Sequence, residues 1–159
     1  MVVSVINIQR RYPLNTAKIQ KLAAGLLEMA IRKGRPRTWN EVTLVLTDDE
    51  GIEPVNRIHL SRQGATDVVS FIYPPMPGEG KRRTGEVLVN VQRAAERAVS
   101  RKSWDPSKEM ALYIAHGFDH LTGGRDRNAT GRARMRRTEL RWLEQACALG
   151  LTDGLITRR

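Results

Sequence analysis

The chain has 159 residues, of which 40% are hydrophobic, and its 27 Lys and Arg against 17 Asp and Glu give a formal net charge of +10. This length predicts one domain over residues 1–159, and the lack of an apolar run of about eighteen residues or a secretory signal predicts a cytoplasmic protein without a membrane segment. The excess positive charge indicates a polyanionic partner, and the lack of a basic amphipathic helix with an aromatic face favours nucleic acid over a membrane surface.

The first half of the chain alternates strands and helices. Its first residues are rich in β-branched side chains, whereas apolar residues from Ile19 to Ala30 recur at helical spacing. Asp48 suits the N-cap of a second helix, and Pro54 indicates an initial turn before the helix proper. We predict strands over 2–8 and 41–47, and helices from 15 to about 34 and from the Asp48 cap to about 60.

The second half holds two strands and three helices. A proline-containing loop that ends in the basic triplet 81–83 separates the strands, and Pro106 suits the first turn of a helix. Leu140 and Leu143 are among the apolar positions of the last helix, which Gly150 ends. We predict strands over 67–72 and 85–90, and helices over 91–102, from 106 through 120, and from about 130 to 148.

This order predicts an α/β (α+β) fold, with a small mixed four-stranded sheet covered by about five helices. The helix that begins at Pro106 packs centrally. Cys147 is the only cysteine, which excludes an internal disulfide and a cysteine-based zinc cluster, and a buried helix position explains it best. An aromatic content of 5% argues against a base-stacking platform, so contacts with the backbone of a nucleic acid would supply most of the affinity.

A candidate metal site lies at the C-terminal end of this central helix. His116 and His120 are four residues apart, so they project from one helix face toward one ion. Gly123 allows the chain to reverse, and Asp126 is the first carboxylate after the reversal. Two imidazoles and one carboxylate leave a coordination position open, as in catalytic zinc sites. Asp119 lies near this face too, and we expect it to be an exposed helix acid. Histidines four apart can also be half-buried residues that bind no metal.

Three blocks of sequence resemble one family. Residues 116–123 read His-Gly-Phe-Asp-His-Leu-Thr-Gly, Asn56 lies ten residues before Thr-Asp-Val-Val-Ser-Phe at 66–71, and residues 85–87 read Gly-Glu-Val. Together, and in their order along the chain, these blocks resemble the YbeY-like ribosomal RNA maturation factors, which are single-strand-specific, metal-dependent endoribonucleases of bacteria. Their signature is His-Gly-x-Leu-His-Leu-x-Gly-Tyr-Asp-His, and the resemblance covers about residues 40 to 145.

The resemblance implies one Zn²⁺ per chain, bound by His116, His120 and Asp126, with a part for His116 in catalysis. Asp126 stands at the family's last histidine; an insertion would instead align Arg127 there and leave two ligands. A family arginine that handles RNA falls on Leu60, so Arg62, two residues away, is the candidate replacement. The implied partners are ribosomal RNA and the small ribosomal subunit, in 3′ end maturation of small-subunit rRNA and in ribosome quality control.

Further residues near these motifs have predicted roles. We expect Thr66, Asp67 and Ser70 to be structural and to line the cleft as a turn and a strand. Arginines that flank the proposed metal are candidates to hold phosphates, although such a charge run is usually a solvated face. The candidates are Arg82, Arg83, Arg125, Arg127, Arg132, Arg134, Arg136 and Arg137.

Three other functions remain open. A zinc peptidase needs Glu after the first histidine, but Gly117 stands there and has no acid or base. Two histidines and a carboxylate also describe a non-haem iron oxygenase, although that site is expected in a β-barrel. The third is a non-catalytic ribosome-binding or RNA-binding protein with a structural metal. Loss of metal-dependent RNA cleavage in His116→Ala separates the enzyme from that alternative. The oligomeric state is left open.

Overall fold

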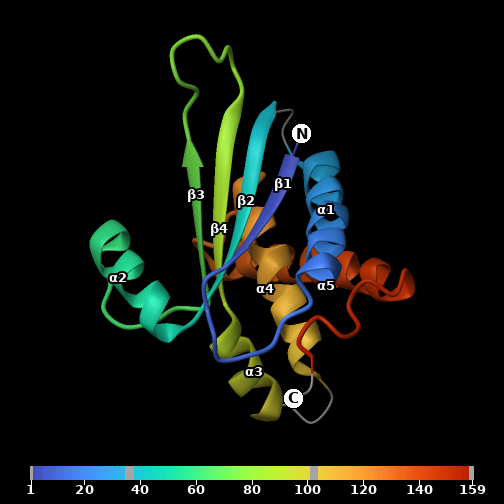
Figure 1. The fold of residues 1–159 in the computed structure, drawn as a ribbon. Helices are drawn as coiled ribbons and strands as arrows, with labels where there is room; N and C mark the ends of the chain where they lie inside the picture. Colours follow the sequence, from blue (N-terminus) through green and yellow to red (C-terminus); the bar gives the residue numbers. More distant parts are fainter. Residues whose placement is uncertain (1, 35–37, 101–103, 158–159) are drawn as a thin grey trace.

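The computed structural model describes residues 2–34, 38–100 and 104–157. Four strands form one sheet, and the helices lie on both of its faces (Figure 1). In chain order the elements are β1 (Val2–Asn7), α1 (Thr16–Lys33), β2 (Trp39–Thr47), α2 (Asp49–Leu60), β3 (Val68–Tyr73), β4 (Arg83–Asn90), α3 (Val91–Ser100), α4 (Pro106–Leu121) and α5 (Ala129–Ala148). The predicted fold class, a mixed four-stranded sheet with five helices, is confirmed.

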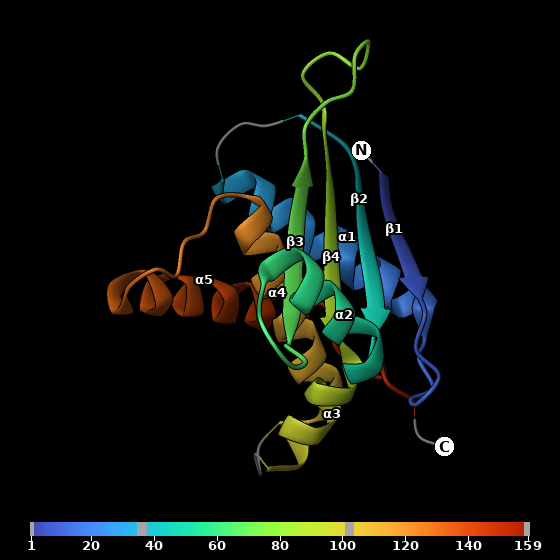
Figure 2. The ribbon, with the colours of Figure 1, turned by 90° about the vertical axis from the view of Figure 1, so that its left-hand side faces the viewer.

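The sheet has the strand order β1-β2-β4-β3. β1, β2 and β4 run parallel, which requires the crossovers that α1 and α2 belong to, whereas β3 and β4 form an antiparallel hairpin. β3 is therefore an edge strand, and the second view looks toward this edge of the sheet, with α2 nearest the viewer (Figure 2). This edge borders the candidate site.

The main core lies between the sheet and α4. Val42, Leu44 and Val87 point from the sheet toward Ile114 and Phe118 of α4, and all five are fully buried. α4 also contacts α1, α3 and α5, so it is surrounded on most sides. On the opposite face α2 covers a smaller cluster of Ile52, Val69 and Leu88. The predicted central position of this helix is confirmed, and it gives the site a rigid base.

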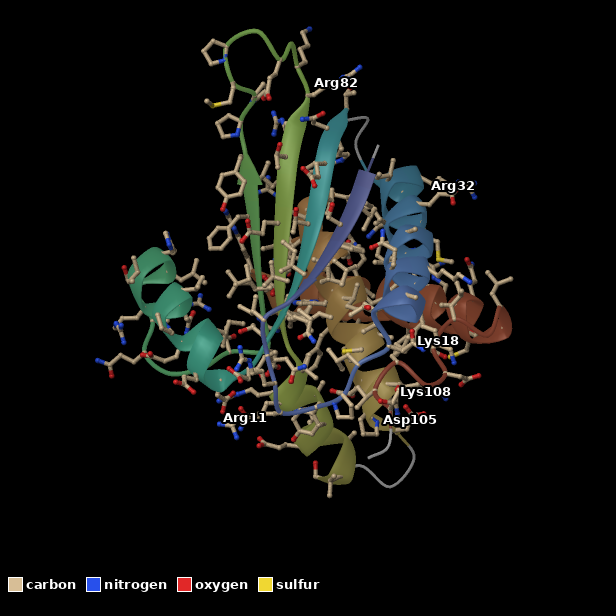
Figure 3. All side chains as sticks on the ribbon, viewed as in Figure 1. Arg11, Lys18, Arg32, Arg82, Asp105 and Lys108 are labelled. Carbon is tan, nitrogen blue, oxygen red and sulfur yellow. The ribbon has the colours of Figure 1, made fainter. Side chains whose placement is uncertain are left out.

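The start of α4 is fixed by Pro106, which the sequence indicated, and by a cap at Asp105, which it did not. The side chain of Asp105 accepts a hydrogen bond from the Lys108 backbone N–H at 2.9 Å, and Pro106 occupies the first turn (Figure 3). Within the described residues, no helix is both long and apolar enough to cross a membrane.

Several predicted details need correction. α2 is one continuous helix that contains Pro54, without a separate initial turn, because the Asp48 cap holds its first turn and the proline removes a single helical hydrogen bond. Leu140 is 37% exposed, so it is not on the buried face of α5. Cys147 is half-buried, with Sγ 3.1 Å from Thr152 Oγ1. The predicted end of the third helix, residues 101–102, lies outside the described residues.

Candidate metal centre

The last turns of α4 carry the two histidines. His116 and His120 are half-buried, and their Nε2 atoms lie 3.2 Å apart. They are side by side because residues four apart share a helix face. The helix ends at Leu121, and Gly123 reverses the chain with a φ of +107°, in the left-handed region that favours glycine.

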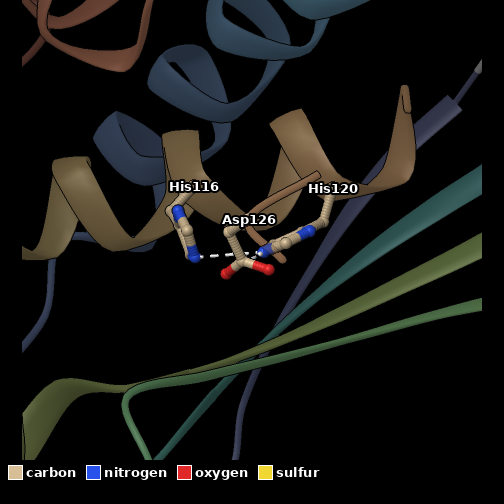
Figure 4. A group of neighbouring side chains, drawn as sticks. All are labelled: His116, His120 and Asp126. Atoms are coloured by element: carbon tan, nitrogen blue, oxygen red, sulfur yellow. Dashed lines mark hydrogen bonds and ion pairs between the residues drawn. The ribbon is translucent and has the colours of Figure 1, made fainter. Parts of the chain in front are cut away.

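The reversal brings Asp126 back to the histidines. Its Oδ2 lies 3.4 Å from His120 Nε2, and one ligand atom from each of the three residues lies within 4.8 Å of the other two (Figure 4). Arg132 donates from Nη1 to the Asp126 backbone carbonyl at 3.4 Å, which connects the loop to α5. The structure thus brings together the three residues that the sequence proposed as ligands, in an arrangement that could hold a metal ion.

The hydrogen bonds of the two Nδ1 atoms determine whether the Nε2 atom of each imidazole is free to bind a metal. The Nδ1 of His120 donates to the Gly124 carbonyl at 3.2 Å, because a carbonyl oxygen can only accept. The Nδ1 of His116 donates to Oε1 of Glu139 at 2.7 Å. In the neutral rings both Nε2 atoms are then bare acceptors that face each other and the Asp126 carboxylate. Such acceptors repel one another unless a cation lies between them, so the donor set fits a metal cation.

Glu139 also changes the charge preference of His116. Burial of the imidazole disfavours its protonated form, but the hydrogen bond and the charge of Glu139 outweigh burial, with help from Asp126 and Asp119. The pKa of His116 is therefore raised above its ordinary value. The neighbouring carboxylates thus favour positive charge at this imidazole.

Sequence analysis did not single out Glu139, although α5 carries a signal for it. Glu139 is four residues after Met135 and four before Leu143, and all three are buried on one face of the helix. An acid buried on an apolar helix face needs a hydrogen-bonding partner, and the half-buried His116 is that partner.

Asp119 is buried, with 1% of its surface exposed, so the prediction of an exposed helix acid is wrong. α4 is enclosed by its neighbours, and the face that carries Asp119 meets the end of α1, where Lys33 Nζ lies 3.2 Å from Asp119 Oδ1. Burial raises the pKa of Asp119, and the charge of Lys33 opposes that shift. Asp119 ties α1 to α4 and does not belong to the group of candidate ligands.

The histidines open into a cleft of about 630 Å³ between α4, α5 and the edge strand β3. Thr66, Asp67 and Ser70 line it, as the sequence indicated. Ser70 Oγ donates to the Gly117 carbonyl at 3.1 Å, which attaches β3 to α4. This hydrogen bond helps to hold β3, which lines the cleft, beside the candidate metal site.

Among the described residues, three arginines from three different segments line this cleft. Arg62 follows α2, Arg97 lies on α3 and Arg136 lies on α5. The sequence proposed Arg62 and Arg136 but not Arg97, which Asp67 holds with an Nη1 to Oδ2 distance of 3.9 Å. The other proposed arginines line different surfaces: Arg125 and Arg134 border a neighbouring pocket, Arg127, Arg132 and Arg137 border neither cavity, and Arg82 and Arg83 lie on the β3–β4 hairpin (Figure 3).

Comparison with known proteins decides the family. The family described as Endoribonuclease YbeY matches residues 4–146 of this chain. The chain belongs to the endoribonuclease YbeY family. The family resemblance predicted from the three sequence blocks is thereby confirmed, and with it the predicted enzyme class, an RNA-cleaving hydrolase.

Relatives in several bacteria agree with this assignment. Endoribonuclease YbeY of Geobacter metallireducens is 31% identical over 147 residues, which cover 87% of this chain and 89% of the relative. Endoribonuclease YbeY of Rhodopirellula baltica is 34% identical over 131 residues, or 80% of this chain, and that match spans 63% of the longer relative. The solution structure of TM1509 from Thermotoga maritima has the same fold, with a TM-score of 0.59 at 17% identity over 99% of both chains.

Proposed function

We propose that this YbeY-family chain is a metal-dependent endoribonuclease that cuts single-stranded RNA, with one Zn²⁺ held by His116, His120 and Asp126. The observation that carries the proposal is the convergence of these three donors at one wall of an arginine-lined cleft. A bound zinc ion would supply Lewis-acid chemistry and lower the pKa of its water toward neutrality. Because these three residues leave a coordination position unused, that chemistry would face the cleft.

The residues around the triad have distinct tasks in this proposal. Glu139 is a positioning residue, because its hydrogen bond fixes the His116 ring so that Nε2 points at its two neighbours. Arg62, Arg97 and Arg136 hold the phosphates on either side of the bond that is cut. The catalytic role proposed for His116 rests on the family resemblance, and the residue lines the cleft.

The size of the cleft favours an unpaired strand. A volume of about 630 Å³ is in the range that encloses small ligands. It therefore takes a nucleotide of a flexible single strand, whereas a double helix would have to separate its strands first. The preference for RNA comes from the family and not from the geometry of the site.

Three further statements rest on the family resemblance and extend the proposal. We place the activity in the cytoplasm, on ribosomal RNA and the small ribosomal subunit. The cut would contribute to 3′ end maturation of small-subunit rRNA and to ribosome quality control. The net charge of +10 supports a polyanionic substrate of this kind.

The test is a cleavage assay on an unstructured RNA and on the same RNA annealed to its complement. We expect the zinc-loaded protein to cut the single strand, to lose activity when a chelator removes the metal, and to recover it when zinc returns. His116→Ala should abolish cleavage, and Arg62→Ala should raise KM more than it lowers kcat. Binding of RNA without cleavage by a zinc-loaded, folded wild type would favour a non-catalytic RNA-binding protein.

A further inference from the structure

A second pocket lies next to the metal cleft, on the other side of the loop that carries Asp126. Its volume is about 330 Å³. It is bordered by the end of α1, by the loop after α4 and by the first turns of α5. Its lining includes Lys33, Gly34, Gly124, Arg125, Gly131 and Arg134.

Close approach of three backbone segments forms the walls of this pocket. A Cβ on Gly34 would lie 2.6 Å from the Thr122 carbonyl oxygen, and a Cβ on Gly131 would lie 2.6 Å from the Arg125 carbonyl oxygen. Glycine at these two positions therefore lets α1, the loop and α5 meet. The Gly124 N–H is used within the fold, where it donates to the Asp119 carbonyl. The charges of the side chains, and not the backbone N–H of Gly124, therefore determine which ligands the pocket attracts.

That charge is positive and is not balanced locally. Lys33 is paired with the buried Asp119 at 3.2 Å, so these two charges compensate each other. Arg125 and Arg134 are exposed, and among the described residues neither guanidinium forms an ion pair or a hydrogen bond with a carboxylate. Two guanidinium groups at one pocket favour an anion with several oxygen acceptors, and a phosphate group matches their donors.

The second pocket and the metal cleft share a wall. Arg125 lines the second pocket and Asp126, the next residue, lines the cleft; on α5, Arg134 lines the second pocket and Arg136 lines the cleft. A strand that leaves the cleft beside Asp126 therefore meets Arg125 and Arg134 next. A site for a free phosphate ion would not need to lie next to the cleft, whereas a polynucleotide bound in the cleft needs further phosphate-binding sites beside it.

We infer that Arg125 and Arg134 form a subsite for a backbone phosphate of single-stranded RNA, outside the metal cleft and on the far side of the Asp126 loop. This inference rests on the proposed function, because it takes the cleft as the place where the strand is cut. The subsite would extend the bound length of RNA and would fix which way the strand leaves the cleft.

The test is equilibrium binding of zinc-loaded full-length protein to 2′-O-methyl RNA, checked to be intact after each titration. A decamer and a trinucleotide are compared, because the shorter RNA fills the cleft without reaching the subsite. The double variant Arg125→Ala/Arg134→Ala is set against Arg137→Ala/Arg141→Ala, which removes the same charge from exposed positions that line neither pocket. Thermal melting confirms that all proteins are folded.

We expect Arg125→Ala/Arg134→Ala to weaken decamer binding about tenfold and to lower the slope of log affinity against log salt by about 0.7 for the lost phosphate contact. Trinucleotide binding should stay within about twofold, and the control variant should lose much less decamer affinity. Equal losses in the two double variants, or equal losses for both RNAs, would overturn the subsite. Inorganic phosphate that binds the wild type through these arginines, while decamer binding is the same in wild type and variant, would also overturn it. This experiment measures binding and not cleavage. A protein that binds RNA without cutting it would refute the proposed function, but the binding result would still test the subsite.

Discussion

Glu139 is the residue on which the geometry of the site depends most. It is 2% exposed, and its Oε1 lies 2.7 Å from His116 Nδ1. A carboxylate at this place keeps the proton on Nδ1 and leaves Nε2 free for a metal. A substitution that removes only the charge of Glu139 distinguishes positioning of the His116 imidazole from simple filling of space in the core.

We expect Glu139→Gln to weaken zinc binding about 10–100-fold, because the neutral amide holds the imidazole less firmly and no longer raises its basicity. The measurement is competition for zinc against a chromophoric chelator. Glu144→Gln, an exposed acid on the same helix, is the matched control and should leave the affinity unchanged. Equal zinc affinity in the two variants, both folded, would show that Glu139 does not position His116.

At the scale of single residues, local spacing explains what the sequence could predict. His116, His120 and Asp126 lie within eleven residues of one another along the chain, so helix geometry and one glycine turn suffice to place them. The partners of Glu139 and Asp119 come from other elements, α4 and α1 respectively. A periodic pattern within one helix does not show which neighbour will meet a buried acid.

At the scale of elements, the contact between α4 and β4 holds the histidines in place. Gly117 lies directly against the sheet, and a Cβ there would be 2.3 Å from Val87 Cγ1 and 3.2 Å from Val68 Cγ1. Glycine at this position therefore serves close packing of the helix on the strands. The same glycine separates this signature from the His-Glu-x-x-His of zinc peptidases.

We expect Gly117→Ala to destabilise the protein by about 1–3 kcal/mol, because α4 or Val87 must shift to accommodate the methyl group. Gly25→Ala in α1 is the control: its Cβ would lie 3.4 Å from the nearest atom, Leu151 Cδ1, so the gain in helix propensity, about 0.5–1 kcal/mol, should dominate. Denaturant unfolding measures both free energies. A Gly117→Ala variant as stable as the wild type would contradict the close contact.

The elements themselves followed from the sequence, but their arrangement did not. Apolar periodicity, the Asp48 cap and Pro106 predicted helices and strands to within a few residues. The order β1-β2-β4-β3 depends on which strands the crossovers bring together, and local patterns do not contain that information. The exposure of Leu140 has the same origin, since contacts with α4 and α1 determine which face of α5 is buried.

At the scale of the whole molecule, the fold selects a few arginines from a strongly basic surface. Arg62, Arg97 and Arg136 come from three segments and meet in the metal cleft, while Arg125 and Arg134 meet in the pocket beside it. The net charge of +10 predicted a polyanionic partner, but it could not show which cations would surround the site. In the tertiary structure these two sets of arginines line neighbouring pockets, one of which contains the candidate metal ligands.

Zinc content per chain tests the central claim most directly. Elemental analysis of the purified wild type should find one zinc per chain, and His120→Ala and Asp126→Ala should each lose it, because each removes one of three protein ligands. Asp153→Ala, at an exposed position of the C-terminal segment, should keep the metal. Full zinc content in a folded Asp126→Ala would contradict the triad, as would a folded wild type that takes up no zinc from excess.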